Sequence, residues 1–123
     1  MILVWLAVAG GLGAVARLVL DGAVREWTEA TGLGTMLVNL TGSLLLGLVA
    51  GLTSASVLPE ALRLVLGTGF LGGYTTFSTA SVESVRLLQQ RRGAASLVHG
   101  LGMLVGSVAL AGLGSWLGLQ AGR

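Results

Sequence analysis

The chain has 123 residues, of which 54% are hydrophobic and only 10% are charged, and its formal net charge is +2. A soluble domain draws about a quarter of its residues from Asp, Glu, Lys and Arg, so this composition excludes a water-facing surface and predicts an all-α integral membrane protein with a single domain, residues 1–123. The absence of cysteine excludes disulfides and thiol chemistry, and no basic cluster exceeds Arg91-Arg92, so we expect no nucleic-acid partner.

Four largely uncharged stretches predict four membrane-spanning helices, because a spanning helix needs about 20 mostly apolar residues. In chain order, the expected spans cover about residues 2–20, 34–53, 62–88 and 97–119. Buried helices of a soluble protein are disfavoured as an explanation, because these runs leave no polar faces for water. We therefore expect a multi-pass protein of the cell (plasma) membrane.

The arginines give a weak indication of orientation. Five of the seven lie in or beside the loops after the first and third spans, and two lie on the opposite side. This modest bias favours those two loops in the cytoplasm, but it leaves insertion in both orientations open.

The third expected span is too long and poorly suited to a continuous helix. As one helix, residues 62–88 would reach roughly 40 Å at about 1.5 Å per residue, against a hydrocarbon core of about 30 Å. Its middle is rich in glycine, threonine and serine, which lower helix propensity. Within lipid, an unwound backbone persists only where protein or a water-filled cavity satisfies its polar groups. The sequence therefore predicts a third helix broken near the midplane, and residues 72–79 are the candidate functional segment.

Small residues four positions apart recur along the chain, a spacing that lets membrane helices approach closely. The spacing indicates that helices pack tightly without saying which helices meet. Because four thin helices enclose little volume, an ion pathway would form more readily between two copies, and a closed two-fold dimer is the default assembly. The pairs are Gly10 with Ala14, Gly47 with Gly51, Gly69 with Gly73, Gly102 with Gly106, and Gly114 with Gly118.

Polar residues inside spans are functional candidates by default. Thr35 and Asn39 are four residues apart, so we expect them to share a face of span two. The Asn39 amide is expensive to leave unpaired in lipid, so it either bonds a neighbouring helix or serves an ion. Thr41 and Ser43 are expected to bond their own helix. His99 stands alone at the start of span four, where we expect it to contact lipid headgroups.

These groups favour a pathway for a small ion and leave the ion unnamed. Hydroxyl and amide donors, with the positive edge of the Phe77 ring, suit a small anion, whereas unwound carbonyls suit a small hard cation. No Ser-His-Asp set or metal-ligand spacing occurs, so we expect no enzyme. We expect no carboxylate in the core of any span. None occurs in residues 1–16, which argues against the alternative of a small four-helix drug or cation exporter driven by proton exchange.

Three motifs resemble the CrcB/Fluc family of fluoride channels. Residues 10–17 (GGLGAVAR) are similar to the family's Gly-Gly-x-x-Gly-Ala-x-x-Arg, with a one-residue offset at the third glycine. Residues 34–43 (GTMLVNLTGS) resemble its Gly-Thr-x-x-Val-Asn-x-x-Gly-Ser. Residues 69–79 (GFLGGYTTFST) match its third-span break and carry the most specific similarity. Length and span count fit too, so the resemblance covers essentially the whole chain.

The resemblance implies a fluoride-selective channel that exports toxic fluoride by passive conduction, built as an antiparallel, dual-topology homodimer with two pores. It implies that Asn39 donates to fluoride and that the ring edge of Phe77 faces the ion. Backbone carbonyls of Gly72 and Thr75 from both subunits would hold a structural sodium ion at the dimer centre. Arg17 would lie near a vestibule. The further pore-lining residues that the resemblance implies are Thr35, Ser78, Thr79 and Ser107.

Two positions depart from the family pattern. The third-span motif usually continues with a second phenylalanine, where this chain has Ala80. In span four, the family's tyrosine four residues before Ser107 is replaced by Met103. The missing ring leaves open slower conduction, another side chain in its place, or a paralogous partner that supplies it. A non-conducting subunit of a heterodimeric fluoride channel is therefore a further alternative.

Overall fold

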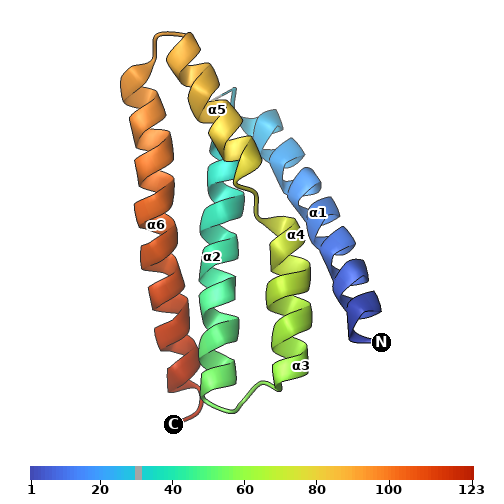
Figure 1. Ribbon diagram of the computed structural model, residues 1–123. Coiled ribbons are helices and arrows are strands. Elements are labelled where there is room, and N and C mark those ends of the chain that lie inside the picture. Colours follow the sequence, from blue (N-terminus) through green and yellow to red (C-terminus); the bar gives the residue numbers. More distant parts are fainter. Residues whose placement is uncertain (30–31) are drawn as a thin grey trace.

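The computed structural model describes residues 1–29 and 32–123, which are helical over most of their length (Figure 1). The chain rises through one long helix and descends through a second. It rises again through shorter helical pieces and descends through a last long helix, so both termini lie at the same end (Figure 1). The helices are α1 (Ile2–Trp27), α2 (Leu33–Ser54), α3 (Glu60–Arg63), the π-helix η1 (Leu64–Leu71), α4 (Gly72–Tyr74), α5 (Ser78–Gln89) and α6 (Gly93–Gln120).

Three of these helices, α1, α2 and α6, are long and apolar enough to cross a membrane. All three are longer than the charge pattern predicts, and α1 differs most, because it continues past residue 20 to Trp27. The charged residues beyond residue 20 do not end the helix. Asp21 and Arg25 lie one turn apart and form an ion pair at 3.1 Å, a pairing that supports a helix rather than breaking it.

The expected third span is divided into four helical pieces over residues 60–89. The first part of the helix ends at Tyr74, and Thr75 has an extended backbone with φ −82° and ψ 158°. The helix resumes at Ser78. The non-helical stretch is therefore residues 75–77, and α5 leaves it at a different angle from α4 (Figure 1).

The break is shorter than the predicted stretch of residues 72–79. Gly72 and Gly73 remain helical despite the low propensity of glycine, and packing against α1 requires Gly73 to be small. A Cβ atom on Gly73 would lie 2.1 Å from the carbonyl oxygen of Gly10. Tertiary packing thus holds the glycines in a helix up to Tyr74.

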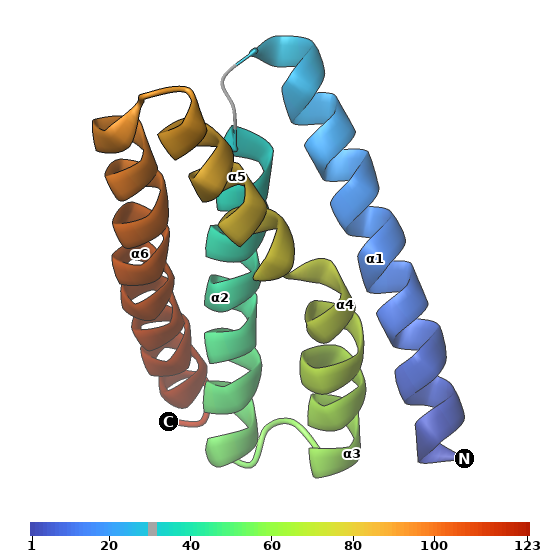
Figure 2. The ribbon, with the colours of Figure 1, turned by 45° about the horizontal axis from the view of Figure 1, so that its top comes forward.

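Helix α2 lies in the middle of the bundle, between α6 and the column formed by α3, η1 and α4, while α1 covers the other side of that column (Figures 1 and 2). The contact between α2 and α6 depends on glycines predicted from their spacing. A Cβ atom on Gly47 would lie 2.0 Å from the carbonyl oxygen of Ala111, and one on Gly114 would lie 2.1 Å from that of Leu44. A Cβ atom on Gly102, in contrast, would meet no other described part of the protein within 4 Å.

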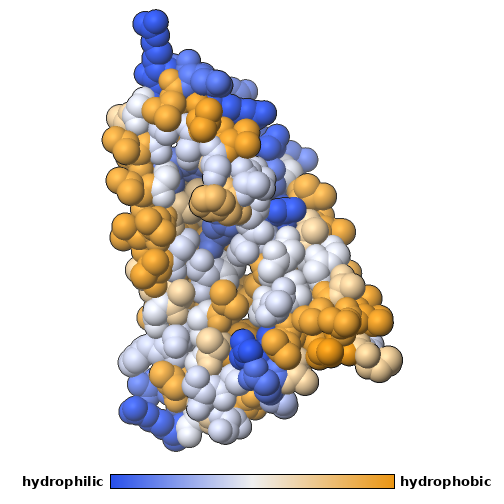
Figure 3. Space-filling model, in the orientation of Figure 1, coloured by the Kyte–Doolittle hydropathy of each residue, from blue (hydrophilic) through white to orange (hydrophobic). Residues whose placement is uncertain are grey.

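Most large apolar side chains point away from the bundle and are exposed, whereas Val38 is the one large side chain that is fully buried among the described residues. In Figure 3, hydrophobic residues cover much of the two flanks. An apolar surface of this extent is unstable in water but favourable in a hydrocarbon solvent. The protein is therefore a multi-pass membrane protein, and its few polar side chains between helices need partners.

Candidate functional site

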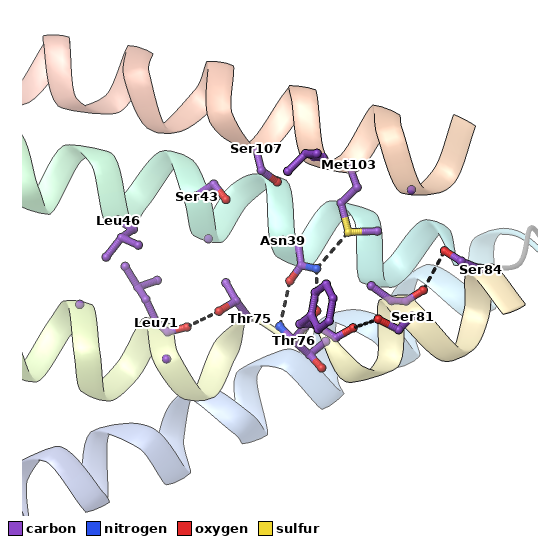
Figure 4. Close-up of a pocket in the computed structure, with 17 residues that line it drawn as sticks. Asn39, Ser43, Leu46, Leu71, Thr75, Thr76, Ser81, Ser84, Met103 and Ser107 are labelled. Carbon is purple, nitrogen blue, oxygen red and sulfur yellow. Dashed lines mark hydrogen bonds between the residues drawn. The ribbon is translucent and has the colours of Figure 1, made fainter. Parts of the chain in front are cut away.

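A cavity of about 640 Å³ opens between α2, the η1–α4–α5 segment and α6. Figure 4 shows that Asn39 lies near its middle, opposite the break in the third segment. Hydroxyl groups and the Asn39 amide line a space that is otherwise apolar. The lining residues are Asn39, Gly42, Ser43, Leu46, Gly67, Leu71, Gly72, Thr75, Thr76, Phe77, Ala80, Ser81, Ser84, Gly100, Met103, Leu104 and Ser107.

The side chain of Asn39 is clamped to the broken segment. Its Nδ2 donates to the carbonyl oxygen of Thr76 at 2.7 Å, and its Oδ1 accepts the Thr76 amide at 2.9 Å. Nδ2 also donates to the Met103 sulfur at 3.0 Å (Figure 4). The Asn39 cluster, defined as Asn39, Thr76 and Met103, therefore satisfies the backbone of the break with a side chain, which an unwound segment in lipid requires.

This clamp takes the Thr76 amide out of the hydrogen-bond pattern of the preceding helical turn. In a continuous helix the Thr76 amide would bond the Gly72 carbonyl four residues earlier, but here it bonds Asn39. The amide and hydroxyl of Thr75 both donate to the Leu71 carbonyl, at 2.9 Å each. Carbonyl oxygens are the ligand type that a small hard cation prefers. The donor chemistry of Gly72 and Thr75 thus fits the cation site that the sequence resemblance implies.

Phe77 is the last residue of the non-helical stretch, and it lines the cavity while remaining 87% exposed. Ala80 lies on the same side of α5 and also lines the cavity, buried between the helices. Ser107 reaches the cavity from α6. The structure thus brings Asn39, Phe77 and Ser107 together, and it places the atypical Ala80 next to them.

Ser81 and Ser84 are hydroxyl residues of the cavity lining that the sequence did not single out. They follow Phe77 and Ala80 by one helical turn, and this spacing of four residues could have identified them. The Ser81 hydroxyl donates to the Phe77 carbonyl at 2.9 Å, and the Ser84 hydroxyl donates to the Ala80 carbonyl at 3.0 Å. Thr41 behaves in the same way on α2, as predicted, because its hydroxyl donates to the Leu37 carbonyl at 2.7 Å. Hydroxyls in this protein mostly return to their own helix.

Ser78 and Thr79 occupy the exposed first turn of α5 and are not among the residues that line the cavity. The Thr76 hydroxyl accepts the Thr79 amide at 3.3 Å and lies 3.3 Å from the Ser78 hydroxyl. This contact satisfies one of the amides that every helix start leaves unpaired. Arg17 is half-buried on α1 and also lies outside the cavity lining. Their assignments to the pore and the vestibule stay predictions.

Thr35 has a different environment from Asn39. It is 3% exposed, and its hydroxyl donates to Oε1 of Glu83 at 3.0 Å. Oε2 of Glu83 lies 3.4 Å from Nε2 of His99. These three residues, from α2, α5 and α6, form the Glu83 cluster, which has no residue among those that line the cavity.

The Glu83 cluster corrects two expectations. His99 is 4% exposed and faces Glu83, so the prediction of a headgroup contact is wrong. A carboxylate is also buried between the helices, since Glu83 is 6% exposed, although none was expected in the core of a span. The backbone at Gly32 lies close to the His99 ring, where only glycine fits. Gly32 has a φ of 83°, and a Cβ atom there would lie 2.8 Å from the ring.

Comparisons with known proteins agree on one family. Residues 4–119 match the family model described as CrcB-like protein, Camphor Resistance (CrcB). A protein of Leifsonia xyli subsp. xyli named fluoride-specific ion channel FluC 1 is 55% identical, over 96% of this chain and 87% of its own length. Fluoride-specific ion channel FluC 2 of Cutibacterium acnes is 43% identical over 96% of this chain and 98% of its own. Fluoride-specific ion channel FluC of Magnetococcus marinus is 42% identical over 100% and 98%.

Proposed function

Because this chain belongs to the CrcB family, we propose that it is a fluoride channel, which lets fluoride leave the cell passively across the plasma membrane. The observation that carries the proposal is the cavity lined by Asn39, Phe77 and hydroxyl groups, within a protein whose flanks are largely apolar (Figure 3). Relatives of this family are named as ion channels, and the protein is not an enzyme.

Neutral donors can replace the water around a small anion without trapping it. The Asn39 amide and the Ser107 hydroxyl would donate hydrogen bonds to fluoride, and the positive edge of the Phe77 ring would face the same ion. Among the residues that the structure describes, no arginine lines the cavity, so the ion would meet no deep electrostatic well along this stretch. This balance of entry and release is what rapid conduction requires.

The proposed assembly is an antiparallel homodimer of four-span subunits, with two pores beside the dimer interface. The lipid phase tolerates broken backbone only where protein or water covers it, and the non-helical stretch of residues 75–77 includes the strongly exposed Phe77. A second copy related by a two-fold axis would cover both, because the same surface then meets itself. Both termini lie at the same end of the bundle (Figure 1), so the chain passes along it an even number of times. This supports residues 60–89 as the third of four spans.

A sodium ion at the dimer centre would be held by the backbone carbonyls of Gly72 and Thr75 from each subunit. A bound cation there would supply positive charge to the carbonyl oxygens of Gly72 and Thr75 from both subunits. The role of these two residues in that arrangement is to hold the two broken segments together. Asn39 supports the geometry from within each subunit, because it takes the Thr76 amide away from Gly72.

Purified protein reconstituted in liposomes provides the test. We expect rapid fluoride efflux after a potassium ionophore sets the membrane potential, with little efflux of chloride and none from protein-free liposomes. The fluoride current should reverse at the fluoride equilibrium potential at any proton gradient, because conduction is passive. An intact dimer that passes no fluoride would contradict the proposal.

Ala80 supports one alternative, a subunit that conducts only with a paralogous partner that supplies the second ring. That alternative predicts no efflux from this protein alone and efflux after co-reconstitution with the paralogue. The drug or cation exporter has less support, because residues 1–16 contain no carboxylate to exchange protons.

A further inference from the structure

The contact between Asn39 and Met103 differs in kind from the other contacts of this amide. Both atoms of the Asn39 side-chain amide bond the Thr76 backbone, at 2.7 and 2.9 Å, in a closed ring of two hydrogen bonds. The remaining N–H points to the Met103 sulfur at 3.0 Å. A thioether sulfur is a weak acceptor, whereas a backbone carbonyl is a strong one.

We infer that Met103 is a positioning residue whose sulfur holds the one Asn39 N–H that fluoride takes up. This inference rests on the proposed function, because it names the group that the ion displaces. The Thr76 bonds cannot be the ones released, since they satisfy the backbone of the break within lipid. A hydrogen bond to an anion is roughly twice as strong as a bond to a neutral acceptor, so fluoride readily outcompetes sulfur.

The surroundings of Met103 allow the exchange. Met103 and Asn39 both line the cavity, and Figure 4 shows the Met103 side chain extending from α6 towards the amide. Methionine is unbranched and polarizable, with several rotatable bonds, so its sulfur can turn aside into the cavity when an ion arrives. The buried N–H therefore has a partner both before and after the ion passes.

The residue at position 103 sets how strongly the Asn39 N–H is held when no ion is present, and therefore how easily fluoride can take it. An oxygen acceptor in place of the sulfur would hold the N–H more firmly and oppose fluoride. A purely apolar side chain would leave the N–H unpaired in the empty state, which destabilises that state and favours the ion. Met103 lies between these limits, at the position where the family pattern has a tyrosine.

Two substitutions test the inference through the fluoride concentration that gives half-maximal flux in liposomes. Met103→Leu keeps the volume of the side chain and removes the acceptor, so that concentration should fall roughly 2- to 5-fold. Met103→Gln adds a carbonyl acceptor, so it should rise roughly 10-fold. Leu104→Gln is the matched control, because it adds the same group at the neighbouring cavity residue and should not produce this rise.

A second measurement follows the Asn39 side-chain amide by NMR in detergent micelles during a fluoride titration. One of its two N–H signals should move with fluoride, and in Met103→Leu that signal should start from a different position. Equal shifts in the half-maximal concentration for Met103→Gln and Leu104→Gln, or changes of the same sign for both Met103 variants, would overturn the inference. If the wild-type protein passes no fluoride at all, the proposed function fails instead.

Discussion

Two polar clusters each include one residue of helix α2, and they differ in their burial and in their hydrogen-bond partners. Thr35 and Asn39 are four residues apart on α2, and the sequence predicts a shared face for both. Thr35 bonds the carboxylate of Glu83 and is almost fully buried, whereas Asn39 bonds backbone and sulfur at the edge of a cavity. The partners supplied by the other helices therefore decide which polar residue stabilises the fold and which one is open to an ion.

The physical difference lies in what each cluster would lose if a solute entered. The Glu83 cluster is built from three residues that are each at most 6% exposed, and a solute would have to separate three helices to reach it. The Asn39 cluster has one weakly held N–H beside open space. We therefore assign folding alone to the Glu83 cluster, and we assign ion contact to the Asn39 cluster in addition to its support of the break.

Of the changes considered, removal of the Glu83 carboxylate should have the largest effect, and it should act on the stability of the protein. Glu83→Leu removes the acceptor of the buried Thr35 hydroxyl and the carboxylate that faces the His99 ring, which we expect to destabilise the protein by about 2–5 kcal/mol. Unfolding in mixed detergent and SDS micelles measures the change. Glu83→Gln is the control, because its carbonyl can still accept from Thr35, and it should lose less. A Glu83→Leu variant as stable as the wild type would contradict the assignment of folding to the Glu83 cluster.

Removal of the Asn39 amide should act mainly on conduction. Asn39→Ala takes away the donor to the ion, and hydrogen bonds to charged groups are worth about 1.5–3 kcal/mol, so we expect fluoride flux to fall roughly 10- to 100-fold. Flux per reconstituted dimer is the measurement. Ser43→Ala, at another cavity residue on α2, is the control and should change flux little. If the two variants lose the same fluoride flux, Asn39 contributes no more to conduction than Ser43 does.

A second ring at position 80 should have a smaller effect, in the opposite direction. Ala80 lines the cavity near Phe77, and an additional ring edge is worth about 0.5–1.5 kcal/mol, so Ala80→Phe should raise fluoride flux about 2- to 10-fold. Ala80→Leu adds bulk without a polarised ring edge and serves as the control. The same gain with leucine would show that filling the space matters and that the ring does not.

Local sequence signals predicted the break better than they predicted the Glu83 cluster. Glycine and hydroxyl residues lower helix propensity wherever they lie, so the interruption was visible in the sequence, although packing of Gly73 against α1 shortened it. Glu83 and His99 gave no such signal. They meet because α5 turns at the break and runs against α6 (Figure 2), and the direction of that turn depends on tertiary packing.

The same limit explains the two cavity serines that the sequence did not identify. Ser81 and Ser84 look like ordinary helix-bonding hydroxyls, and they do bond their own helix. Only the position of α5 over the cavity makes them lining residues. The spacing from Phe77 could have indicated the face, but it could not have indicated which helix that face meets.

Thr35→Val, compared with Asn39→Ala, tests the division between the two clusters most directly. Valine keeps the shape of Thr35 and removes the hydroxyl that bonds Glu83, so stability should fall by about 1 kcal/mol while fluoride flux per folded dimer stays within about twofold of the wild type. Asn39→Ala should lose most of its flux under the same conditions. If Thr35→Val loses as much flux per dimer as Asn39→Ala, Thr35 belongs to the pathway and the division between the clusters is wrong.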